Sequence, residues 1–300
     1  MSSNISVRNA HPDDVGIVCS FVRNLANYEN LAAEVDIDES SFCDSLFRCL
    51  NEPRPEVMVA ESLLDHRIIG FSLFIRILSS TFHLEDLFVS QDSRKTGAGI
   101  ALLSALASYS VSKGAHTLEW ACLDWNQPSL DFYASLGALP IADRVILRIS
   151  GASLFKQRLS LEPKRIVRYA EKIPDEFDKS LKCIQAIDAA GNVKAALYFT
   201  LSFSTFKATS VILVTSVVFE NMSGFVTSLV DFLISLALDR GYKRVELRIH
   251  PVLDQEFANA LLTQYGAIEM KGWIPFALTG ENLRSLANRK KNSISHAGEI

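Results

Sequence analysis

Cysteine is scarce in this sequence, and the cysteines that occur follow no disulfide or metal-binding pattern. There are five, an odd number, and no two of them form a C-x-x-C pair. None lies at metal-ligand spacing from a histidine. These absences argue against a disulfide-stabilised secreted scaffold and against a zinc site. We therefore expect reduced, mostly buried thiols, no metal, and a cytoplasmic protein.

The sequence also lacks an excess of positive charge and a long apolar run. The formal net charge is −4 at pH 7, whereas binding to nucleic acid usually requires a basic face. No stretch approaches the roughly 18 consecutive apolar residues of a membrane span, and the N-terminus has no apolar signal-peptide core. We expect neither nucleic acid nor a membrane among the partners.

The sequence does contain enough apolar material for two packed domains. Apolar residues make up 48% of the 300 residues, and about 150 residues is a common domain size. In the first half we predict strands at 5–8, 56–62, 68–77, 82–89, 117–123 and 145–149. Helices are predicted from Pro12 through Leu25, at 38–50, from Gly97 or Gly99 to Lys113, and at 128–136. This order predicts a mixed, twisted sheet with flanking helices, the α/β (α+β) class.

Part of this pattern recurs after residues 151–175, a polar and basic stretch that we interpret as a linker. Strands are predicted at 181–188, 193–203, 211–219 and 243–249, a helix begins at Gly224, and Gly241 caps it. The repeat indicates a degenerate internal duplication. We predict one domain at 1–150, a linker at 151–175, and at 176–300 a truncated copy that lacks the first two helices.

The most informative segment is a predicted strand that leads into a glycine-containing loop and then a helix. The loop reads Arg94-Lys95-Thr96-Gly97-Ala98-Gly99. Glycines let backbone N–H groups approach a phosphate closely. The start of the helix adds free donors and partial positive charge, and Arg94 and Lys95 add full charges. The pattern predicts a pyrophosphate site.

Three interpretations compete for this loop. The plainest is a tight turn without a ligand, because a pair of glycines is common. A dinucleotide-binding loop would have a third glycine where this sequence has Leu102, although Glu119 stands where a ribose-binding acid is expected. That kind of loop also normally follows the first strand of a domain, and a P-loop is excluded because no Gly-Lys-Ser/Thr occurs. The third interpretation is an acyl-CoA loop.

The third interpretation rests on a resemblance. The loop matches the pattern Arg/Gln-x-x-Gly-x-Gly/Ala of the acetyl-CoA loop in the GNAT superfamily. The strings Asn27-Tyr28-Glu29, Leu84-Glu85-Asp86-Leu87-Phe88-Val89 and Trp125-Asn126-Gln127-Pro128-Ser129-Leu130-Asp131-Phe132-Tyr133 resemble, in order and spacing, the spermidine/spermine (diamine) N-acetyltransferase family. The resemblance covers about residues 5–150, and the second half resembles only the fold. It implies tandem GNAT-like folds, with the catalytic one first.

The resemblance also implies a set of site residues. Tyr133 takes the place of the family's general acid, which protonates the departing thiolate. In the family, the strand before the loop splays from its neighbour, and one of its N–H groups stabilises the developing oxyanion. The implied contacts with acetyl-CoA are Leu87, Phe88, Val89, Arg94, Lys95, Thr96, Gly97, Ala98, Gly99, Ile100, Asn126, Gln127, Pro128 and Ser129. The implied substrate contacts are Tyr28, Glu29, Glu85, Glu119, Trp120 and Ala121.

Glu85 is the candidate general base on chemical grounds. A primary ammonium has a pKa near ~10.4 and cannot attack while it is charged. Glu85 lies on the strand beside the implied acetyl site and can take the proton through water. Plain structural explanations stand beside these roles, with Tyr133 packing on the sheet, Glu85 as a solvated strand acid, and Trp120 as a core aromatic.

We predict an enzyme that transfers an acetyl group from acetyl-CoA to a primary amine of a small molecule by direct attack in a ternary complex. The family has acidic residues before its last strands that hold a polycation, but here Ala142, Asp143 and Arg144 stand there. A short diamine or a lysine analogue is therefore as consistent as a polyamine. Two other functions stay open: a non-catalytic acyl-CoA-binding or regulatory protein, and a peptide or protein N-acetyltransferase.

The second copy has lost the residues that carry chemistry in the first. When the copies are aligned on Gly97 and Gly224, the positions of Arg94, Lys95, Gly99, Glu85 and Tyr133 hold Asn221, Met222, Val226, Ile212 and Leu262. We predict that 176–300 is non-catalytic and binds no CoA. The family resembled is dimeric, and we favour a monomer in which the second copy replaces a partner subunit over a homodimer.

Overall fold

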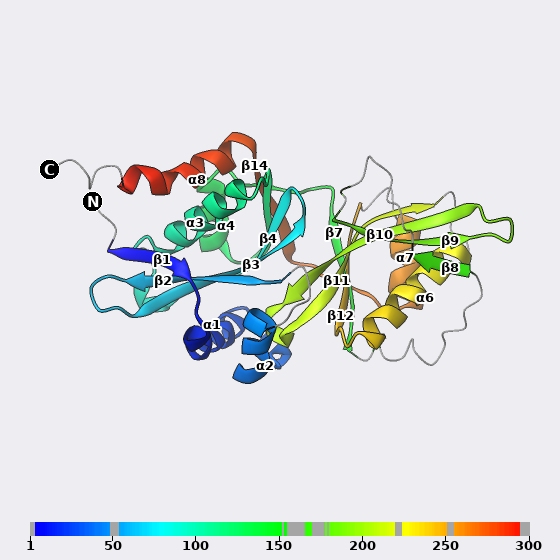
Figure 1. Ribbon diagram of the computed structural model, residues 1–300, viewed down its shortest axis with the longest axis horizontal. Coiled ribbons are helices and arrows are strands. Elements are labelled where there is room, and N and C mark those ends of the chain that lie inside the picture. Colours follow the sequence, from blue (N-terminus) through cyan, green and yellow to red (C-terminus); the bar gives the residue numbers. More distant parts are fainter. Residues whose placement is uncertain are drawn as a thin grey trace. The chain divides into compact units, whose positions relative to one another are not determined.

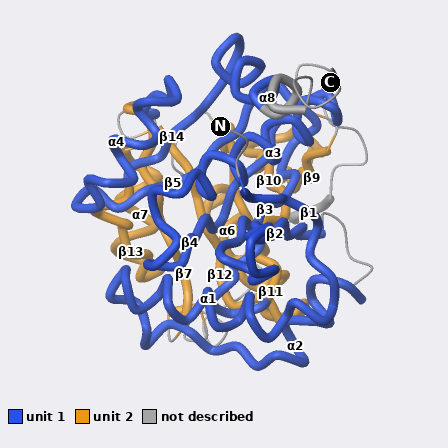
Figure 2. Tube along the Cα trace, turned by 90° about the vertical axis from the view of Figure 1, so that its left-hand side faces the viewer, with its two compact units in different colours: residues 1–141, 203–208, 274–300 blue, residues 142–202, 209–273 orange. Residues whose placement is uncertain are grey.

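The computed structural model describes residues 4–48, 54–151, 153–154, 166–169, 178, 180–219, 224–250 and 255–294. The chain forms two compact units, which are coloured separately in Figure 2. Unit 1 consists of Met1–Ile141, Phe203–Ala208 and Ile274–Ile300, and unit 2 consists of Ala142–Ser202 and Thr209–Trp273. Each unit is built on one seven-stranded sheet with helices packed against it (Figure 1).

Unit 1 holds most of the elements predicted for the first half. Its strands are β1 (Ile5–Asn9), β2 (Glu56–Ser62), β3 (Ile68–Leu78), β4 (Thr81–Val89), β5 (Thr117–Leu123), β6 (Leu139–Pro140) and β14 (Trp273–Thr279). Its helices are α1 (Val15–Tyr28), α2 (Glu39–Cys43), α3 (Ala98–Ser112), α4 (Gln127–Ser135) and α8 (Gly280–Ile294). The second predicted helix, 38–50, forms α2 and a π turn at Asp44–Arg48, and its last two residues lie outside the described part.

Unit 2 contains the strands β7 (Val145–Ser150), β8 (Ile166–Tyr169), β9 (Lys182–Ile187), β10 (Val193–Ser204), β11 (Thr209–Phe219), β12 (Arg244–Ile249) and β13 (Ile268–Glu269). Its helices are α6 (Gly224–Asp239) and α7 (Gln255–Gln264). The chain between β8 and β9 covers only 170–181, whereas 10–55 separates β1 from β2. The copy therefore has no room there for counterparts of α1 and α2, as predicted.

The two sheets have the same strand order. The order is β1-β2-β3-β4-β5-β14-β6 in unit 1 and β8-β9-β10-β11-β12-β7-β13 in unit 2. In both, antiparallel strands lead to one parallel pair, β4 with β5 and β11 with β12. This correspondence confirms the predicted mixed α/β class and the predicted duplication with a shortened second copy.

The units do not coincide with the predicted boundaries, because the two halves exchange one strand. We assigned 145–149 to the first domain, but β7 pairs with β12 and β13 in the sheet of unit 2. In return, β14 from the C-terminal part lies between β5 and β6 in unit 1. The predicted linker 151–175 also contains β8, which pairs with β9. Hydrophobic patterns locate strands, but hydrogen-bonded partners decide the sheet that each one joins.

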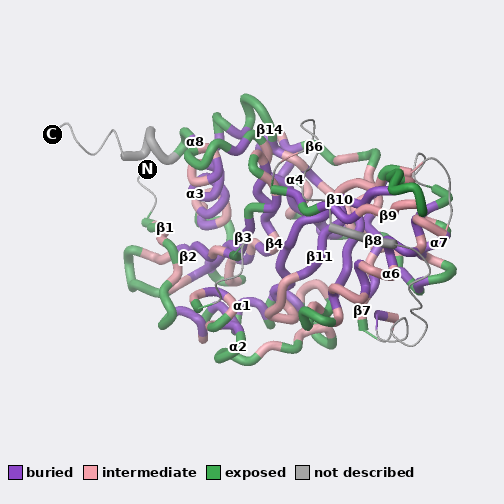
Figure 3. Tube along the Cα trace, turned by 45° about the vertical axis from the view of Figure 1, so that its right-hand side comes forward, coloured by how far each residue is buried: buried purple, intermediate pink, exposed green. Residues whose placement is uncertain are grey.

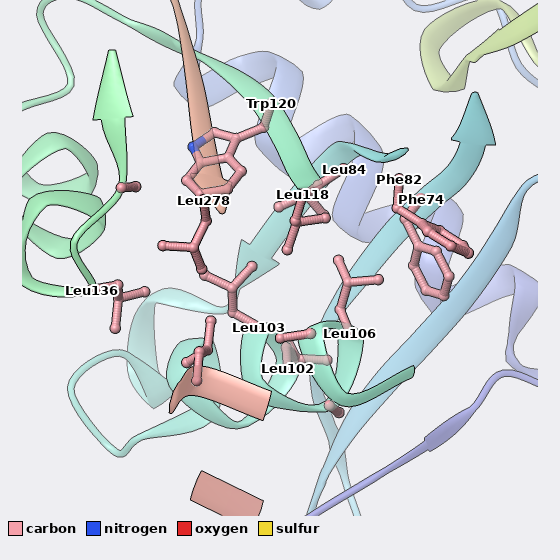
Figure 4. Close-up of a cluster of buried hydrophobic side chains, with 14 of the residues drawn as sticks. Phe74, Phe82, Leu84, Leu102, Leu103, Leu106, Leu118, Trp120, Leu136 and Leu278 are labelled. Atoms are coloured by element: carbon pink, nitrogen blue, oxygen red, sulfur yellow. The ribbon is translucent and has the colours of Figure 1, made fainter. Parts of the chain in front are cut away.

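The core of unit 1 explains why the C-terminal elements belong to it. Leu102, Leu103 and Leu106 of α3 are fully buried against the sheet, and so is Leu278 of β14. Figure 4 shows Leu278 beside Trp120 in this cluster. Burying side chains of this size stabilises each by roughly 1.5–3 kcal/mol. Figure 3 shows that buried residues gather on the strands of both sheets and exposed residues on the connecting loops.

Candidate active site

The candidate site lies where β4 and β5 separate. The two strands pair in parallel at Thr81–Thr117, Phe82–Leu118 and His83–Glu119. Beyond these positions β4 continues to Val89 and β5 to Leu123, with no further pairing between them in the described residues. The backbone groups of β4 past the fork are therefore available to a ligand that lies between the strands.

Glu85 occupies a β-bulge just past this fork. Leu84 pairs with Phe74 and Asp86 pairs with Leu73, so Glu85 is the extra residue of β4. A bulge bends the strand and redirects a side chain, and bulges are common next to active sites. The Glu85 side chain keeps 21% of its surface exposed. A polar substrate can therefore reach it.

Three carboxylates and one imidazole gather at the fork. His83 is 5% exposed, and its Nε2 lies 3.5 Å from Glu85 Oε2 while its Nδ1 lies 4.0 Å from Glu119 Oε1. Glu29 directly follows α1, and its carboxyl group interacts electrostatically with that of Glu85. Burial, together with the charge of Glu85, raises the pKa of Glu29 to about 7. The cluster therefore gains negative charge as the pH rises through neutrality, which suits a cationic amine.

Tyr133, on α4, stands in an aromatic pocket. Its ring is 8% exposed, with the Trp120 centroid at 4.8 Å and the Phe276 centroid at 6.0 Å. Burial raises the phenol pKa well above its usual value, and the nearby Cys122 and Glu29 act in the same direction. Among the described interactions its hydroxyl has no hydrogen-bond partner. The phenol is therefore protonated at neutral pH and can donate its proton.

The predicted phosphate loop has the geometry of an anion site. Gly97 caps the start of α3 with φ at +99°, and Lys95 also has a positive φ of 65°. The Thr96 hydroxyl donates to the Ser93 carbonyl at 2.6 Å and so fixes the turn. In the described part of the chain, no backbone carbonyl accepts from the N–H groups of residues 96–100. These N–H groups lie beside the exposed, positively charged Arg94 and Lys95, a combination that suits an anion.

Tyr28 joins the two segments predicted to hold the cofactor. Its hydroxyl donates to Asn126 Oδ1 at 3.0 Å. The Arg94 guanidinium lies 5.0 Å from the centre of its ring, and the Trp125 ring centroid lies 5.6 Å away. Tyr28 thus contacts predicted cofactor residues, although we predicted it as a substrate contact.

The other predicted residues lie on β4 and β5, at the start of α4 and at the start of α3. Phe88 of β4 packs on Phe21 of α1, while Leu87 and Val89 contact the core under α3. The start of α4 carries Pro128 in its first turn, and Gln127 donates to Asp131 at 2.6 Å. Ala98 is buried, whereas Gly99, Ile100, Ala121 and Ser129 are half-buried.

Trp120 is the predicted substrate residue that the structure places elsewhere. Leu118, Trp120 and Cys122 all lie in the hydrophobic core, so alternation along β5 turns Glu119 and Ala121 to the opposite face. The Trp120 ring is 2% exposed and contacts Tyr133 and Phe276. The Trp120 side chain therefore packs beside Tyr133 and is not exposed to a substrate.

Among the residues that contact predicted site residues, His83 and Phe276 were not predicted from the sequence. His83 lies two positions before Glu85 on the same strand, so strand alternation could have revealed it. Phe276 contacts Tyr133 but lies far along the chain on β14. No local pattern could connect it to α4.

The second unit differs from the first at the matching positions. Ile212, aligned with Glu85, pairs with Val245 of β12 and is fully buried in the core of unit 2. An apolar core side chain thus stands where the first copy has the half-exposed carboxylate. Val226, aligned with Gly99, is buried in the core of unit 2, and Asn221 and Met222 lie outside the described residues.

The described residues contain no group of three or more His, Cys, Asp or Glu side chains arranged to hold a metal ion. They also contain no helix of the length and apolarity that a bilayer span needs.

Comparisons with known proteins connect this geometry to a family. The sequence profile described as acetyltransferase (GNAT) family matches residues 23–138. The thialysine N-epsilon-acetyltransferase of Sus scrofa is 28% identical over 159 residues, which cover 47% of this chain and 88% of the relative. The L-ornithine N5-acetyltransferase of Arabidopsis thaliana is 30% identical over 110 residues, which cover 35% of this chain and 48% of that relative.

Two solved structures resemble nearly the whole chain. A GCN5-related N-acetyltransferase from Sphaerobacter thermophilus has a TM-score of 0.55 and 11% identity, and the match covers 92% of this chain and 96% of that one. A tandem GNAT protein from the clavulanic acid biosynthesis pathway has a TM-score of 0.51 and 13% identity, with 92% and 98% covered. At this identity the similarity shows the fold alone, and it extends across both units.

Proposed function

The chain belongs to the GNAT family of acetyltransferases through residues 23–138, and on that premise we propose the substrate and the chemistry. The enzyme transfers the acetyl group of acetyl-CoA, its co-substrate, to a primary amine of a small molecule in the cytoplasm. A polyamine, a short diamine and a lysine analogue fit the site chemically. The relatives support this class, since they are named for thialysine and ornithine acetylation.

The residues of the α3 loop fit the pyrophosphate of acetyl-CoA. Gly97 adopts a backbone conformation that side chains disfavour, and the N–H groups after it lack backbone acceptors in the described residues. Arg94 and Lys95 supply two positive charges beside them. Asn126 to Ser129, at the start of α4, would hold a further part of the molecule. The backbone of Leu87, Phe88 and Val89 would hold the pantetheine arm and the acetyl group, because β4 no longer pairs with β5 at these residues.

The protein moves two protons. Glu85 accepts one from the incoming ammonium through water, which leaves a neutral amine able to attack the acetyl carbonyl carbon. The C–N bond then forms while the C–S bond breaks. Tyr133 donates its phenol proton to the leaving thiolate. The nitrogen that has attacked loses its remaining extra proton to water, and the tyrosinate is reprotonated from water. Glu29 and Glu119 supply negative charge that attracts the cationic substrate before it is deprotonated.

One observation carries this proposal: the fork between β4 and β5 has carboxylates at its base, and buried Tyr133 beside it contacts Trp120 of β5. A protein that only binds acyl-CoA needs neither a general acid such as Tyr133 nor a general base such as Glu85 near the acetyl group. This arrangement favours catalysis over a regulatory acyl-CoA-binding role.

A panel of amines tests the proposed activity directly. Purified full-length protein is incubated with acetyl-CoA and, in turn, lysine analogues, ornithine, short diamines, polyamines and a lysine-containing peptide. Release of free thiol with one or more small amines is the expected result. Thiol release with the peptide alone would contradict the proposal of a small-molecule substrate. The absence of thiol release with every amine would contradict the proposed acetyltransferase activity.

The charge of Glu29 predicts a pH dependence of substrate affinity. Because its pKa is raised to about 7, the neutral acid persists up to neutrality and the carboxylate dominates above it. The amine stays cationic up to about pH 10, so its KM should fall as the pH rises from 6 to 8. Glu29→Gln should remove this fall and raise KM at pH 8 by about ten-fold, in line with one partly screened charge pair.

The matched control for Glu29→Gln is Glu39→Gln, which neutralises an exposed acid of α2 in the same unit. Initial rates at several amine concentrations between pH 6 and 8.5 give KM for each variant. The control should follow the wild-type curve. If Glu29→Gln follows it as well, Glu29 does not contact the amine.

We also propose that unit 2 does no chemistry, so calorimetric titration with CoA should give one site per chain. Val226 is 1% exposed in the core at the place aligned with Gly99, and the fully buried Ile212 stands at the place aligned with Glu85. A valine side chain there leaves no room for the close backbone approach of a phosphate. Two sites of comparable affinity per chain would contradict a non-binding second copy.

The duplicated chain should behave as a monomer. The chain already holds two copies of the fold, each with its own seven-stranded sheet, whereas a homodimer of single-copy chains holds one copy in each subunit. Sedimentation velocity between low and high micromolar concentrations should give one species of the mass of a single chain. A stable species of twice that mass would contradict internal pairing and leave the catalytic residues unaffected.

A further inference from the structure

The strand exchange places a C-terminal strand beside the candidate catalytic tyrosine. In unit 1, β14 lies between β5 and β6 and pairs with β6 at Phe276–Pro140 and Ala277–Leu139. The Ile141 N–H donates to the Pro275 carbonyl at 2.8 Å. This strand therefore takes a place inside the sheet, next to β5, which carries Trp120 and Glu119.

Phe276 is the residue of β14 that reaches the tyrosine. Its ring is 5% exposed, its centroid is 6.0 Å from that of Tyr133, and it is stacked at 12° on Trp120 at 6.2 Å. Trp120 in turn lies 4.8 Å from Tyr133. The three rings form a closed triangle. Tyr133 contacts both other rings, so the loss of the Trp120 ring or of the Phe276 ring would leave part of the Tyr133 ring without a packing partner.

The helix that follows β14 holds the same region from a second direction. Leu283 and Leu286 of α8 are buried in the core of unit 1. Asn282 Nδ2 donates to the Gly137 carbonyl at 3.0 Å, just past the end of α4. A β carbon at Gly137 would lie 2.6 Å from Asn282 Nδ2, so this contact depends on a glycine there. The C-terminal segment therefore touches α4 at its tyrosine and at its end.

We propose that Phe276 is a positioning residue for Tyr133, and that the C-terminal segment thereby completes the active site of the first half. The inference rests on the proposed function, since it assigns no separate reaction. Phe276 fixes the direction of the phenol and excludes water from it. Burial also raises the pKa of the phenol, so the proton leaves it only for a base that is held beside it. The second half of the chain is thus required for catalysis without carrying catalytic residues of its own.

The first test follows the Tyr133 ring without any assay of activity. The protein has seven tyrosines, so 3-fluorotyrosine labelling gives few ¹⁹F resonances, and Tyr133→Phe identifies one of them. In the otherwise native protein this resonance should show almost no shift between H₂O and D₂O. Phe276→Leu should give it a clear solvent isotope shift. Phe257→Leu, the same change at a buried residue of unit 2, should not.

The second test is a double-mutant cycle on kcat. Phe276→Leu keeps an apolar side chain but loses the flat ring, and it should lower kcat about ten-fold, while KM for acetyl-CoA stays the same. In the Tyr133→Phe background the same change should have no further effect, because Phe276 acts through the phenol. Equal losses in both backgrounds would show a merely structural role and overturn the proposal.

The two tests separate the failure of this proposal from failure of the proposed function. An unchanged ¹⁹F resonance in a folded Phe276→Leu protein overturns the positioning role whether or not the protein acetylates amines. A changed resonance in a protein that releases no thiol with any amine supports the packing of Phe276 on Tyr133 but contradicts the proposed enzyme. Circular dichroism and thermal unfolding verify that each variant is folded.

Discussion

Tyr133→Phe is expected to lower turnover by roughly ten- to a thousand-fold, in line with the usual size of general acid catalysis. The change removes one oxygen and keeps the ring, so the contacts with Trp120 and Phe276 remain. Within the described residues no hydrogen bond of the hydroxyl is lost. The dissociation constant for acetyl-CoA should therefore be unchanged, and the loss should appear in kcat.

The environment of the phenol makes it a weaker acid than a free tyrosine, so catalysis has to come from its position. Burial holds its pKa well above the ordinary value, and a thiolate has a conjugate pKa of about 8.5. Transfer of a proton from the phenol to a free thiolate is thus uphill. The proton transfer can assist the reaction only if the Tyr133 hydroxyl already lies beside the sulfur when the C–S bond breaks. The aromatic pocket holds the phenol ring in one position for that purpose.

A matched control for Tyr133→Phe is Tyr109→Phe. Tyr109 lies on α3 of the same unit, and its hydroxyl donates to Glu56 at 2.7–2.8 Å. Burial and that carboxylate raise its pKa to about 12. Its loss should lower stability by about 1–3 kcal/mol and leave kcat unchanged. Wild-type turnover in Tyr133→Phe would remove this residue from the mechanism.

Local patterns in the sequence located the parts of the candidate site that are local in the chain. The strand before the loop, the loop itself and the start of α3 are contiguous from Thr81 to Ile100, and glycine and charge mark them directly. Tyr133 follows Asn126 by seven residues on one short helix. Glycine and charge mark the loop in the residues themselves, whereas the role of Tyr133 is what the resemblance of the string from Trp125 to Tyr133 implies.

What the sequence did not predict depends on the choice of partners across the sheet. Nothing in the residues of β14 indicates that it enters between β5 and β6, since either unit offers an apolar surface of the same kind. The same limit explains the misplaced boundary near residue 150, because β7 could have paired in either sheet.

The error about Trp120 has a different origin. Adjacent residues on a strand face opposite sides, so Glu119 and Trp120 cannot both contact the same substrate through their side chains. Leu118 and Cys122 mark the core face of β5 in the sequence itself. A resemblance carried over as a continuous stretch hides this alternation, whereas the strand period resolves it.

Gly97→Val is expected to abolish CoA binding. Gly97 has a φ of +99° at the start of α3, a conformation that costs a β-branched residue roughly 1–3 kcal/mol. The space near a β carbon there is open, with only Ile100 Cγ2 at 4.0 Å. The folded protein can therefore accommodate the added atoms. They would project where the pyrophosphate has to approach the N–H groups of the helix, so the main loss is in binding.

The chain offers a matched control at the other end of the same helix. Gly114 also has a positive φ, +80°, and nothing lies within 4 Å of a β carbon there. Gly114→Val should therefore lower the free energy of unfolding by a similar amount and leave the calorimetric affinity for CoA unchanged. Gly97→Val should lower the free energy of unfolding as much as Gly114→Val does, but it should show no detectable heat of CoA binding. If a folded Gly97→Val protein binds CoA as tightly as the Gly114→Val protein, the loop before α3 is not the phosphate site, and the cofactor assignments from Arg94 to Ile100 fail together.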